Sequence, residues 1–206
     1  MTDIFRIHPE NPQKRLIKQA ADRIRGGGVV IYPTDAAYAV GCALENKRGL
    51  ERIVQMRQLD DKHQFTILCR DLSELAIYAK VENWAFRLLK ANTPGPYTFI
   101  LRATGEVPRR LMHTKKKTLG LRVPDNAVVQ ALLEELGEPI MSTTLLLPGE
   151  EYPLIDPEEI YERVGKQVDL VLDGGWGEMD TTTVVDLEAD SPVVLREGKG
   201  DPAPFR

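Results

Sequence analysis

GGGVVIYPTD, residues 26–35, marks a change from a helix to a buried strand. The three glycines stop the preceding helix, and the run Val29–Tyr32 that follows is apolar and mostly β-branched. A short continuous run of this kind is typical of a strand that is covered on both faces. Thr34 and Asp35 come directly after the strand. A helix, a glycine turn and a buried strand with a polar end indicate an α/β fold.

Helical and strand patterns alternate on both sides of this stretch, which favours a partly parallel sheet. Asn11-Pro12 predicts the N-cap and first position of a helix that runs to Arg25. The last three predicted strands follow a single helix, so the sheet should be mixed. Further helices are predicted over residues 46–57, from 71, and over 81–92, 126–137 and 156–165, and strands over 4–7, 65–69, 97–101, 119–123, 140–143, 168–172, 183–187 and 193–195.

The chain should form one domain, because no linker, repeat or low-complexity tract interrupts it. Its 206 residues suit a single domain, residues 1–206, with a core over about residues 10–200. A hydrophobic content of 42% and a charged content of 28% exclude collagenous, disordered and coiled-coil chains. The apolar runs are far shorter than the roughly 18 residues of a membrane span. The N-terminus carries no apolar segment of a secretory signal.

Cys42 and Cys69 are far apart, which fits a reducing cytoplasm better than a disulfide framework. We expect both to be small core residues, and we expect a cytoplasmic protein with no membrane partner. His8, His63 and His113 are scattered with no partner at zinc spacing, so no metal site is predicted. The phosphate-binding loop of nucleotidases, the dinucleotide fingerprint and the hydrolase nucleophile elbow are absent.

The charge distribution is more informative than the formal net charge of −4. Seven basic residues lie between Arg102 and Arg122, against the single acid Glu106. Residues 150–190 carry thirteen acids against two bases. A concentrated basic stretch in an acidic protein can bind a polyanion, or it can be a solvated loop. The candidate RNA-binding residues are Arg109, Arg110, Lys115, Lys116 and Lys117.

Polar side chains follow three of the predicted strands. Thr34 and Asp35 end the first, Arg122 lies near the end of another, and residues 142–144 (Ser-Thr-Thr) follow a third. In open α/β sheets, ligands bind beyond the carboxyl ends of strands. Hydroxyls and guanidinium groups suit phosphate or carboxylate oxygens. Together these strand ends predict a groove for an anion, although each hydroxyl taken alone could equally cap a helix.

Six collinear segments resemble the YrdC/YciO family, and the resemblance covers essentially the whole chain. The segment at 32–42 (YPTDAAYAVGC) is similar to the N-terminal motif of the family, and the segment at 94–99 (PGPYTF) to its P-G-P-x-T stretch. The remaining matches are LRVP at 121–124, PIMSTT at 139–144, TTVVD at 182–186 and LREG at 195–198.

The resemblance implies a twisted mixed sheet flanked by helices, with a concave, positively charged groove associated with double-stranded RNA or tRNA. The best understood members are threonylcarbamoyl-AMP synthases, which join L-threonine, bicarbonate and ATP for the threonylcarbamoyladenosine modification of tRNA. By this resemblance ATP is a substrate, accompanied by Mg²⁺, and no cofactor is tightly bound. The resemblance also assigns roles to residues: Thr34, Arg122 and Thr182 would meet threonine, and Arg57, Thr118, Ser142, Thr144 and Arg196 would meet ATP or AMP.

The chain departs from the synthase motifs at two places. The K-x-R motif is represented by Arg57, the expected catalytic cation, and by Leu59. The S-x-N motif is represented by Thr144 and Leu146. A fixed cationic donor at a reacting phosphate is typically worth around 10²–10³ in rate, so these losses predict weak or altered activity. The pattern matches the YciO branch of the family.

Two interpretations therefore stay open. One is a synthase-like nucleotidyltransferase with weakened or altered substrate use. The other is a non-catalytic protein that binds double-stranded RNA, tRNA or the ribosome. The family resemblance favours the first, whereas Leu59, Leu146 and the basic stretch favour the second.

Overall fold

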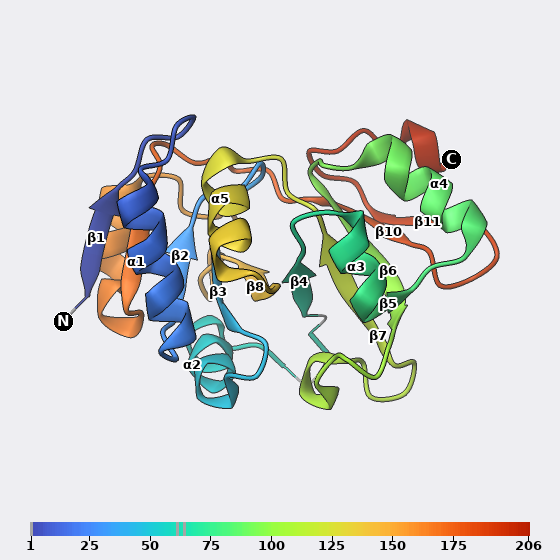
Figure 1. Ribbon diagram of the computed structural model, residues 1–206, viewed down its shortest axis with the longest axis horizontal. Helices are drawn as coiled ribbons and strands as arrows, with labels where there is room; N and C mark the ends of the chain where they lie inside the picture. The colour runs from blue at the N-terminus through green and yellow to red at the C-terminus, as the bar shows by residue number, and fades with distance from the viewer. Residues whose placement is uncertain (1, 61, 64) are drawn as a thin grey trace.

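The computed structural model describes residues 2–60, 62–63 and 65–206, and in them eleven strands form one mixed β-sheet (Figure 1). Both parallel and antiparallel pairs occur, as the sequence predicts. The strands are β1 (Asp3–Arg6), β2 (Val30–Tyr32), β3 (Ala39–Ala43), β4 (Thr66–Leu68), β5 (Ala79–Lys80), β6 (Tyr97–Ala103), β7 (Thr118–Arg122), β8 (Ile140–Thr144), β9 (Leu170–Asp173), β10 (Thr183–Asp186) and β11 (Val193–Arg196). Their order is β1-β9-β2-β3-β8-β4-β7-β6-β10-β11, and β5 pairs with β6.

Six α-helices flank this sheet within the described residues. Four of them begin where the sequence places a side-chain cap: Asn46, Asp71, Asn126 and Asp156 each accept a backbone amide of the first turn. Such a cap satisfies an amide that has no partner inside the helix. The helices are α1 (Lys14–Arg25), α2 (Lys47–Arg57), α3 (Leu72–Tyr78), α4 (Asn83–Asn92), α5 (Ala127–Leu136) and α6 (Pro157–Val164), with short 3₁₀ turns at Arg109–Leu111, Gly165–Gln167 and Ala203–Phe205.

The start of α1 corrects the sequence prediction, which placed the N-cap at Asn11. The helix begins at Lys14, and its first hydrogen bond runs from the Ile17 amide to the Gln13 carbonyl, at 3.0 Å. The His8 ring nitrogen Nδ1 accepts the amides of residues 10 and 11, at 3.1 and 2.9 Å. That side chain holds the segment in a turn, which keeps it out of the helix.

Two strands are absent from the sequence prediction, the two-residue β5 and the longer β3. Strand β3 lies between β2 and β8 in the middle of the sheet, and Cys42 lies inside it. Its residues are mostly small, so they give a weak strand signal. A Cβ at Gly41 would lie 2.4 Å from the Met141 carbonyl oxygen and 2.6 Å from the Tyr32 hydroxyl. Only glycine fits at this close approach to β8 and Tyr32.

Side-chain alternation divides the core between the two faces of the sheet. On one face, α1 and α5 cover the half around β2 and β9, in a cluster that includes Tyr32 and Leu172. On the opposite face, residues of α2, α3, α4 and α6 pack in a larger cluster that includes Ile53, Leu89 and Phe99. Cys42 and Cys69 are both buried in this larger cluster, as predicted.

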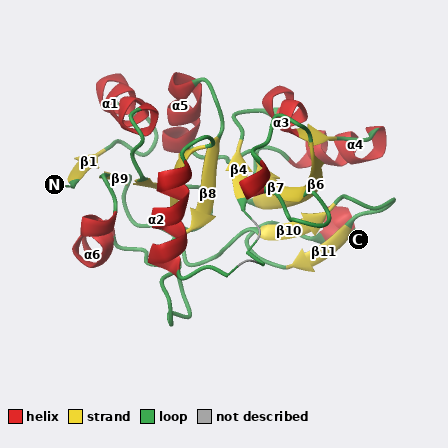
Figure 2. Ribbon diagram, turned by 90° about the horizontal axis from the view of Figure 1, so that it is seen from below, coloured by secondary structure: helices red, strands yellow, loops and turns green. Residues whose placement is uncertain are grey.

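The twist of the sheet leaves part of the first face uncovered. Adjacent strands typically rotate by about 20–25°, so nine successive pairings amount to about half a revolution across the sheet. Figure 2 accordingly shows α3 and α4 on the same side of the molecule as α1 and α5, although they pack on opposite faces of the sheet. No helix among the described residues packs on the first face over β7, β6 and β10. The pocket described below opens there.

Candidate functional site

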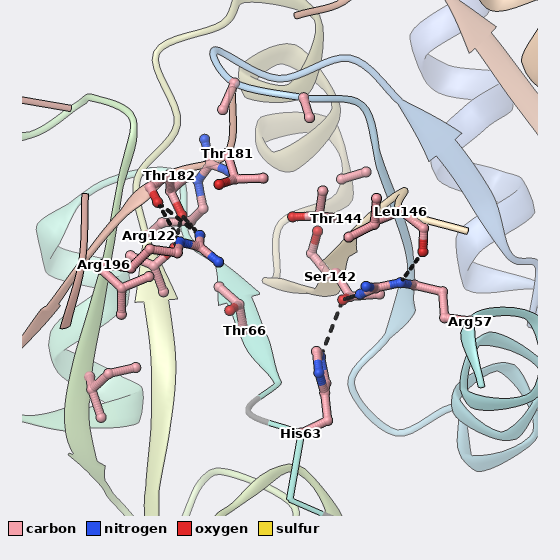
Figure 3. A pocket seen from close by; sticks show the side chains of 17 residues that line it. Arg57, His63, Thr66, Arg122, Ser142, Thr144, Leu146, Thr181, Thr182 and Arg196 are labelled. Atoms are coloured by element: carbon pink, nitrogen blue, oxygen red, sulfur yellow. Dashed lines mark hydrogen bonds between the residues drawn. The ribbon is translucent and has the colours of Figure 1, made fainter. Parts of the chain in front are cut away.

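A pocket of about 300 Å³ lies on this open face, at the middle of the sheet (Figure 3). Its floor is polar because Thr66, Thr98 and Ser142 occupy inward positions of β4, β6 and β8. Gly120 leaves room for the Thr66 side chain in the pocket floor, since a Cβ at residue 120 would lie 2.7 Å from the Thr66 hydroxyl oxygen. The residues that line the pocket are Ala36, Ala37, Ala39, Arg57, His63, Thr66, Thr98, Ile100, Arg122, Ser142, Thr143, Thr144, Leu146, Thr181, Thr182, Val184 and Arg196.

Arg122, at the end of β7, is 7% exposed and pairs with the Asp35 carboxylate. Asp35 also accepts the amide of Asp125, at 2.8 Å, so its position is fixed from both sides. Burial lowers the pKa of Arg122, and the Asp35 charge opposes that change. The buried Nε of Arg122 has no hydrogen-bond partner among the described residues. A buried donor without a partner is costly, so it is a natural contact for a ligand oxygen.

Arg57 enters the pocket from the opposite wall, as the last residue of α2 (Figure 3). Its Nε donates to the Leu146 carbonyl oxygen at 2.9 Å, and its Nη1 donates to the Thr143 hydroxyl. Burial lowers its pKa. None of the described carboxylates forms an ion pair with it. The guanidinium is therefore a partly desolvated positive charge that faces the pocket without a counter-ion.

Arg196 lies on the same side as Arg122 and comes from the edge strand β11 (Figure 3). Its Nε and Nη2 donate to the Thr182 carbonyl oxygen, at 3.1 and 2.8 Å. The Thr182 hydroxyl oxygen is hydrogen-bonded to the Thr98 hydroxyl oxygen, at 2.7 Å. Burial lowers the pKa of Arg196, and again no ion pair is found in the described chain. Two guanidinium groups without carboxylates thus face one small cavity.

The Ser142 hydroxyl is arranged as a donor into the pocket. The buried Tyr32 hydroxyl donates to the Ser142 oxygen at 2.6 Å. Burial raises the pKa of Tyr32, so this hydroxyl stays protonated and keeps donating. The remaining proton of Ser142 is then available to an acceptor on a ligand.

His63 is a pocket residue that the sequence analysis missed. Its Nε2 lies 3.3 Å from the Thr143 hydroxyl oxygen, and its ring meets Phe65 edge-on. Burial and the charge of Arg57 lower the pKa of His63 to about 4, so the ring is neutral at neutral pH. In sequence it stands alone in a polar loop, and no spacing connects it with residue 143. Only the pairing of β4 with β8 brings the two segments together.

Two of the predicted site residues do not line the pocket. The Thr34 hydroxyl donates to the Ala37 carbonyl oxygen at 2.7 Å and accepts the Ala36 amide at 2.9 Å, so it shapes the turn that carries Asp35. Thr118 is 2% exposed at the start of β7. It lies four residues from Arg122, about 13 Å along an extended strand.

The two leucines that replace family polar residues differ in position. Leu146 lines the pocket beside Arg57. Leu59 lies just beyond α2, where its amide bonds to the Val54 carbonyl oxygen at 3.1 Å, and it is not among the lining residues. Of the two departures, Leu146 is therefore the one that changes the wall of the pocket.

The basic stretch forms a second, separate cavity of about 650 Å³ around the turn before β7. We call its basic residues the basic loop cluster. Arg110 is not part of it, because its side chain donates to the Leu44 carbonyl oxygen and faces Glu45 at 3.6 Å. The cluster comprises Lys80, Arg102, Arg109, Lys115, Lys116 and Lys117.

Neither a metal site nor a membrane-spanning helix is found among the described residues. No three His, Cys, Asp or Glu side chains among them are grouped to hold a metal ion. None of their helices has the length and apolarity that crossing a membrane requires.

Comparison with known proteins gives consistent matches along the chain. A family model named Sua5_yciO_yrdC, with the description "Telomere recombination", matches residues 22–198. YciO from Escherichia coli K12 is 59% identical over 205 residues, and the match covers 100% of both chains. The crystal structure of E. coli YciO superposes with a TM-score of 0.97, again over 100% of each chain.

More distant matches carry functional names. Threonylcarbamoyl-AMP synthase from Vibrio vulnificus YJ016 is 27% identical over 186 residues, which are 88% of this chain and 98% of that protein. The crystal structure of P. abyssi Sua5 complexed with L-threonine superposes with a TM-score of 0.87 at 27% identity. That match covers 96% of this chain and 58% of the Sua5 chain.

Proposed function

The chain belongs to the Sua5/YciO/YrdC family, and from this premise we propose that it binds L-threonine and ATP in the central pocket and joins them slowly, with bicarbonate, into threonylcarbamoyl-AMP. Pyrophosphate is the second product. The substrates are those that the family resemblance implies, and the reaction is slower than in the synthases.

The observation that supports it is the charge inside the pocket. Three guanidinium groups face about 300 Å³, and the single carboxylate paired with any of them is Asp35, within the described residues. Arg57 and Arg196 lie on opposite walls without counter-ions (Figure 3). Nucleotide phosphates that extend across the pocket would contact both groups, and Arg122 leaves a further donor for an amino-acid carboxylate.

Each ligand has a matching set of donors. Arg122, held by Asp35 and with its Nε unpartnered, suits the threonine carboxylate. Arg57, Arg196 and the donating Ser142 hydroxyl suit phosphate oxygens. Thr144 and Thr182 also line the pocket, Thr182 beside Arg196 and Thr144 beside Leu146 (Figure 3). The cavity is at the lower end of the roughly 300–1,000 Å³ of ligand sites, so the nucleotide base must extend beyond it.

Mg²⁺ fits this pocket only as a companion of the nucleotide. The described lining residues include no carboxylate, which a protein-held Mg²⁺ would need. The triphosphate oxygens would therefore hold the ion. We propose a reducing cytoplasm as the compartment, and the two free, buried cysteines support it.

The slow rate follows from Leu146. Its side chain occupies the wall beside Arg57, where the family motif has an amide. A leucine donates no hydrogen bond to the phosphates, and the loss of one preorganised donor typically costs 10²–10³ in rate. We therefore expect turnover about 100-fold or more below that of an authentic synthase.

The test is pyrophosphate release from ATP with bicarbonate and each amino acid in turn, beside the V. vulnificus synthase. The expected release is slow and depends on both L-threonine and bicarbonate. Arg122→Lys should lose L-threonine binding in calorimetry, because lysine cannot form a two-pronged contact with a carboxylate. The control is Arg87→Lys on the exposed surface of α4. Absence of heat with L-threonine and with ATP at millimolar concentration would overturn the proposal.

A second function, binding of double-stranded RNA or tRNA, is supported by the basic loop cluster. Six basic side chains line one cavity of an otherwise acidic protein. Phosphate contacts of this kind need no base recognition and no catalysis. Such a protein would bind RNA and release no pyrophosphate, so the assay above separates the two functions.

A further inference from the structure

The proposed reaction must remove a proton from the threonine ammonium group, and few groups in the pocket can take one. Among the described lining residues, the titratable side chains are three arginines and His63. Arginine stays protonated in proteins. Behind the wall, Asp35 is held by Arg122, and Tyr32 is a donor whose pKa is raised by burial. His63 is thus the one described lining side chain that is a neutral base at neutral pH.

The hydrogen bonds around Thr143 fit a particular placement of protons. Arg57 can only donate, so the Thr143 oxygen accepts there. Nε2 of His63 lies 3.3 Å from the same oxygen, and its role in that contact depends on the tautomer. In the tautomer with the ring proton on Nδ1, Nε2 accepts the hydroxyl proton of Thr143. A cation contacts the oxygen of this hydroxyl and a neutral base contacts its proton, which is the arrangement of an activated hydroxyl.

We infer that Thr143 and His63 form a proton relay for carbamate formation, in which Thr143 touches the substrate ammonium group and His63 is the final acceptor of the proton. The inference rests on the proposed function and names two residues that carry out its first step.

The step balances as follows. L-threonine as ammonium and one bicarbonate ion give the N-carboxylate, one water and one proton. The amino nitrogen forms a bond to the bicarbonate carbon as the bond to the bicarbonate hydroxyl breaks. Of the two protons that the nitrogen loses, one leaves with this hydroxide as water. The other passes to the Thr143 oxygen while the Thr143 proton moves to Nε2 of His63.

The charges around His63 suit such a step only when ligands are present. Arg57 faces the ring from α2 and disfavours the charged form, whereas Asp60 in the adjoining loop favours it. Thr143 and the Phe65 ring are uncharged. Carboxylate and phosphate groups that bind near Arg57 offset its charge, so bound substrates raise the proton affinity of His63 toward the working pH.

The kinetic test compares the full-length protein with His63→Ala, His63→Gln, Thr143→Val and Thr143→Ser, and with Lys62→Gln in the same exposed loop as a control. Pyrophosphate release is measured from pH 5 to 9 at saturating substrates, and calorimetry gives ligand affinities. Both His63 variants and Thr143→Val should lose about 100-fold or more in turnover, the usual worth of a positioned acid or base. Affinities should stay within threefold, Thr143→Ser should be faster than Thr143→Val because it retains the hydroxyl, and added imidazole should restore turnover to His63→Ala.

A His63→Gln variant within threefold of the wild-type rate would overturn the relay. So would a slow His63→Ala variant that imidazole does not rescue. Wild-type protein that binds both ligands but releases no pyrophosphate would overturn the relay and leave binding intact, whereas protein that binds neither would overturn the proposed function itself. Nitrogen-15 NMR gives a readout without turnover: Nε2 of His63 should be unprotonated at pH 7, and a proton there in the ligand-free protein would also overturn the relay.

Discussion

Single residues in the pocket take their chemistry from the partners that burial gives them. Arg122 is pinned by a carboxylate, whereas Arg57 and Arg196 bond only to hydroxyl and carbonyl oxygens. Partial desolvation of a guanidinium without a counter-ion is costly to the folded protein, and it lowers the pKa of both residues. An anionic ligand reduces that cost, so these two groups favour the binding of anions.

Replacement of Arg196 by alanine should weaken ATP binding. A hydrogen bond to a charged group contributes about 1.5–3 kcal/mol, which corresponds to roughly a 10- to 150-fold rise in Kd. Isothermal calorimetry with ATP checks this value. Arg206→Ala is the matched control, since Arg206 lies on the exposed surface and pairs with Glu197. Equal affinities for the wild type and Arg196→Ala would contradict the assignment of Arg196 to the nucleotide.

The half-buried, neutral His63 should make the free energy of unfolding fall in mild acid. Its pKa is about 4 in the folded protein and about 6.5 in an unfolded chain. Because the unfolded chain takes up the proton first, the contribution of His63 is complete above pH 6.5 and is lost as the pH falls toward 4. After allowance for the partial exposure of the ring, the loss in the free energy of unfolding should be on the order of 2–3 kcal/mol.

Urea unfolding of the wild type and of His63→Gln between pH 7 and pH 4.5 measures this loss. The glutamine cannot take up a proton, so the variant should have a shallower pH dependence. Parallel curves for the two proteins would show that His63 is not held neutral by the fold.

At the scale of elements, helix ends decide where the functional side chains point. Asn46 caps α2 at its start, and Gln58 ends it in the left-handed conformation with φ of 53°. Arg57 is therefore the last helical residue and reaches across to Leu146 and Thr143. The same kind of end occurs on α5, where Gly137 has φ of 74° and its amide bonds to Leu133.

Replacement of Gly137 by alanine should lower the free energy of unfolding by about 1–2 kcal/mol. An added methyl group would meet no atom within 4 Å, so the whole cost is the left-handed backbone that L-residues avoid. Gly105→Ala is the control, because it also meets no atom within 4 Å and has no positive φ. Denaturant unfolding of both variants gives the comparison. A Gly137→Ala protein as stable as Gly105→Ala would contradict the backbone argument.

At the scale of the whole molecule, the twist separates two positively charged sites. The central pocket opens on the uncovered face of the sheet, whereas the basic loop cluster surrounds the turn before β7. No residue lines both cavities among those described. Changes at one site should therefore leave the other intact, and this independence allows each proposed activity to be tested separately.

Charge reversal of Lys115, Lys116 and Lys117 to glutamate should nearly abolish binding to structured RNA and leave L-threonine binding unchanged. Each lost phosphate contact should reduce the log–log salt slope by about 0.9 for a duplex. Filter binding at several salt concentrations measures both quantities. The control reverses Lys14, Arg15 and Lys18 on the exposed side of α1, with the same change in net charge. Unchanged RNA affinity and slope would remove the basic loop cluster as an RNA site.

The sequence by itself determined the α/β class, the mixed sheet and most helix starts, because caps, glycine stops and apolar periodicity are local signals. Asn46, Asp71, Asn126 and Asp156 each begin the helix that the sequence predicts. Local signals also pointed to strand ends that carry pocket residues, among them Arg122 and Ser142.

Only the tertiary structure decided which of these residues meet. It added β3, whose small residues carry little propensity, and it brought His63 to Thr143 through the pairing of β4 with β8. In the folded protein the Thr34 hydroxyl bonds to the backbone of its own turn rather than lining the pocket. Leu146 lines the pocket, whereas Leu59 does not. Contacts between segments about 80 residues apart, such as Arg57 with Thr143 and His63 with Thr143, depend on strand order and sheet twist. No local pattern encodes strand order, since it follows from how all the apolar faces are buried at once.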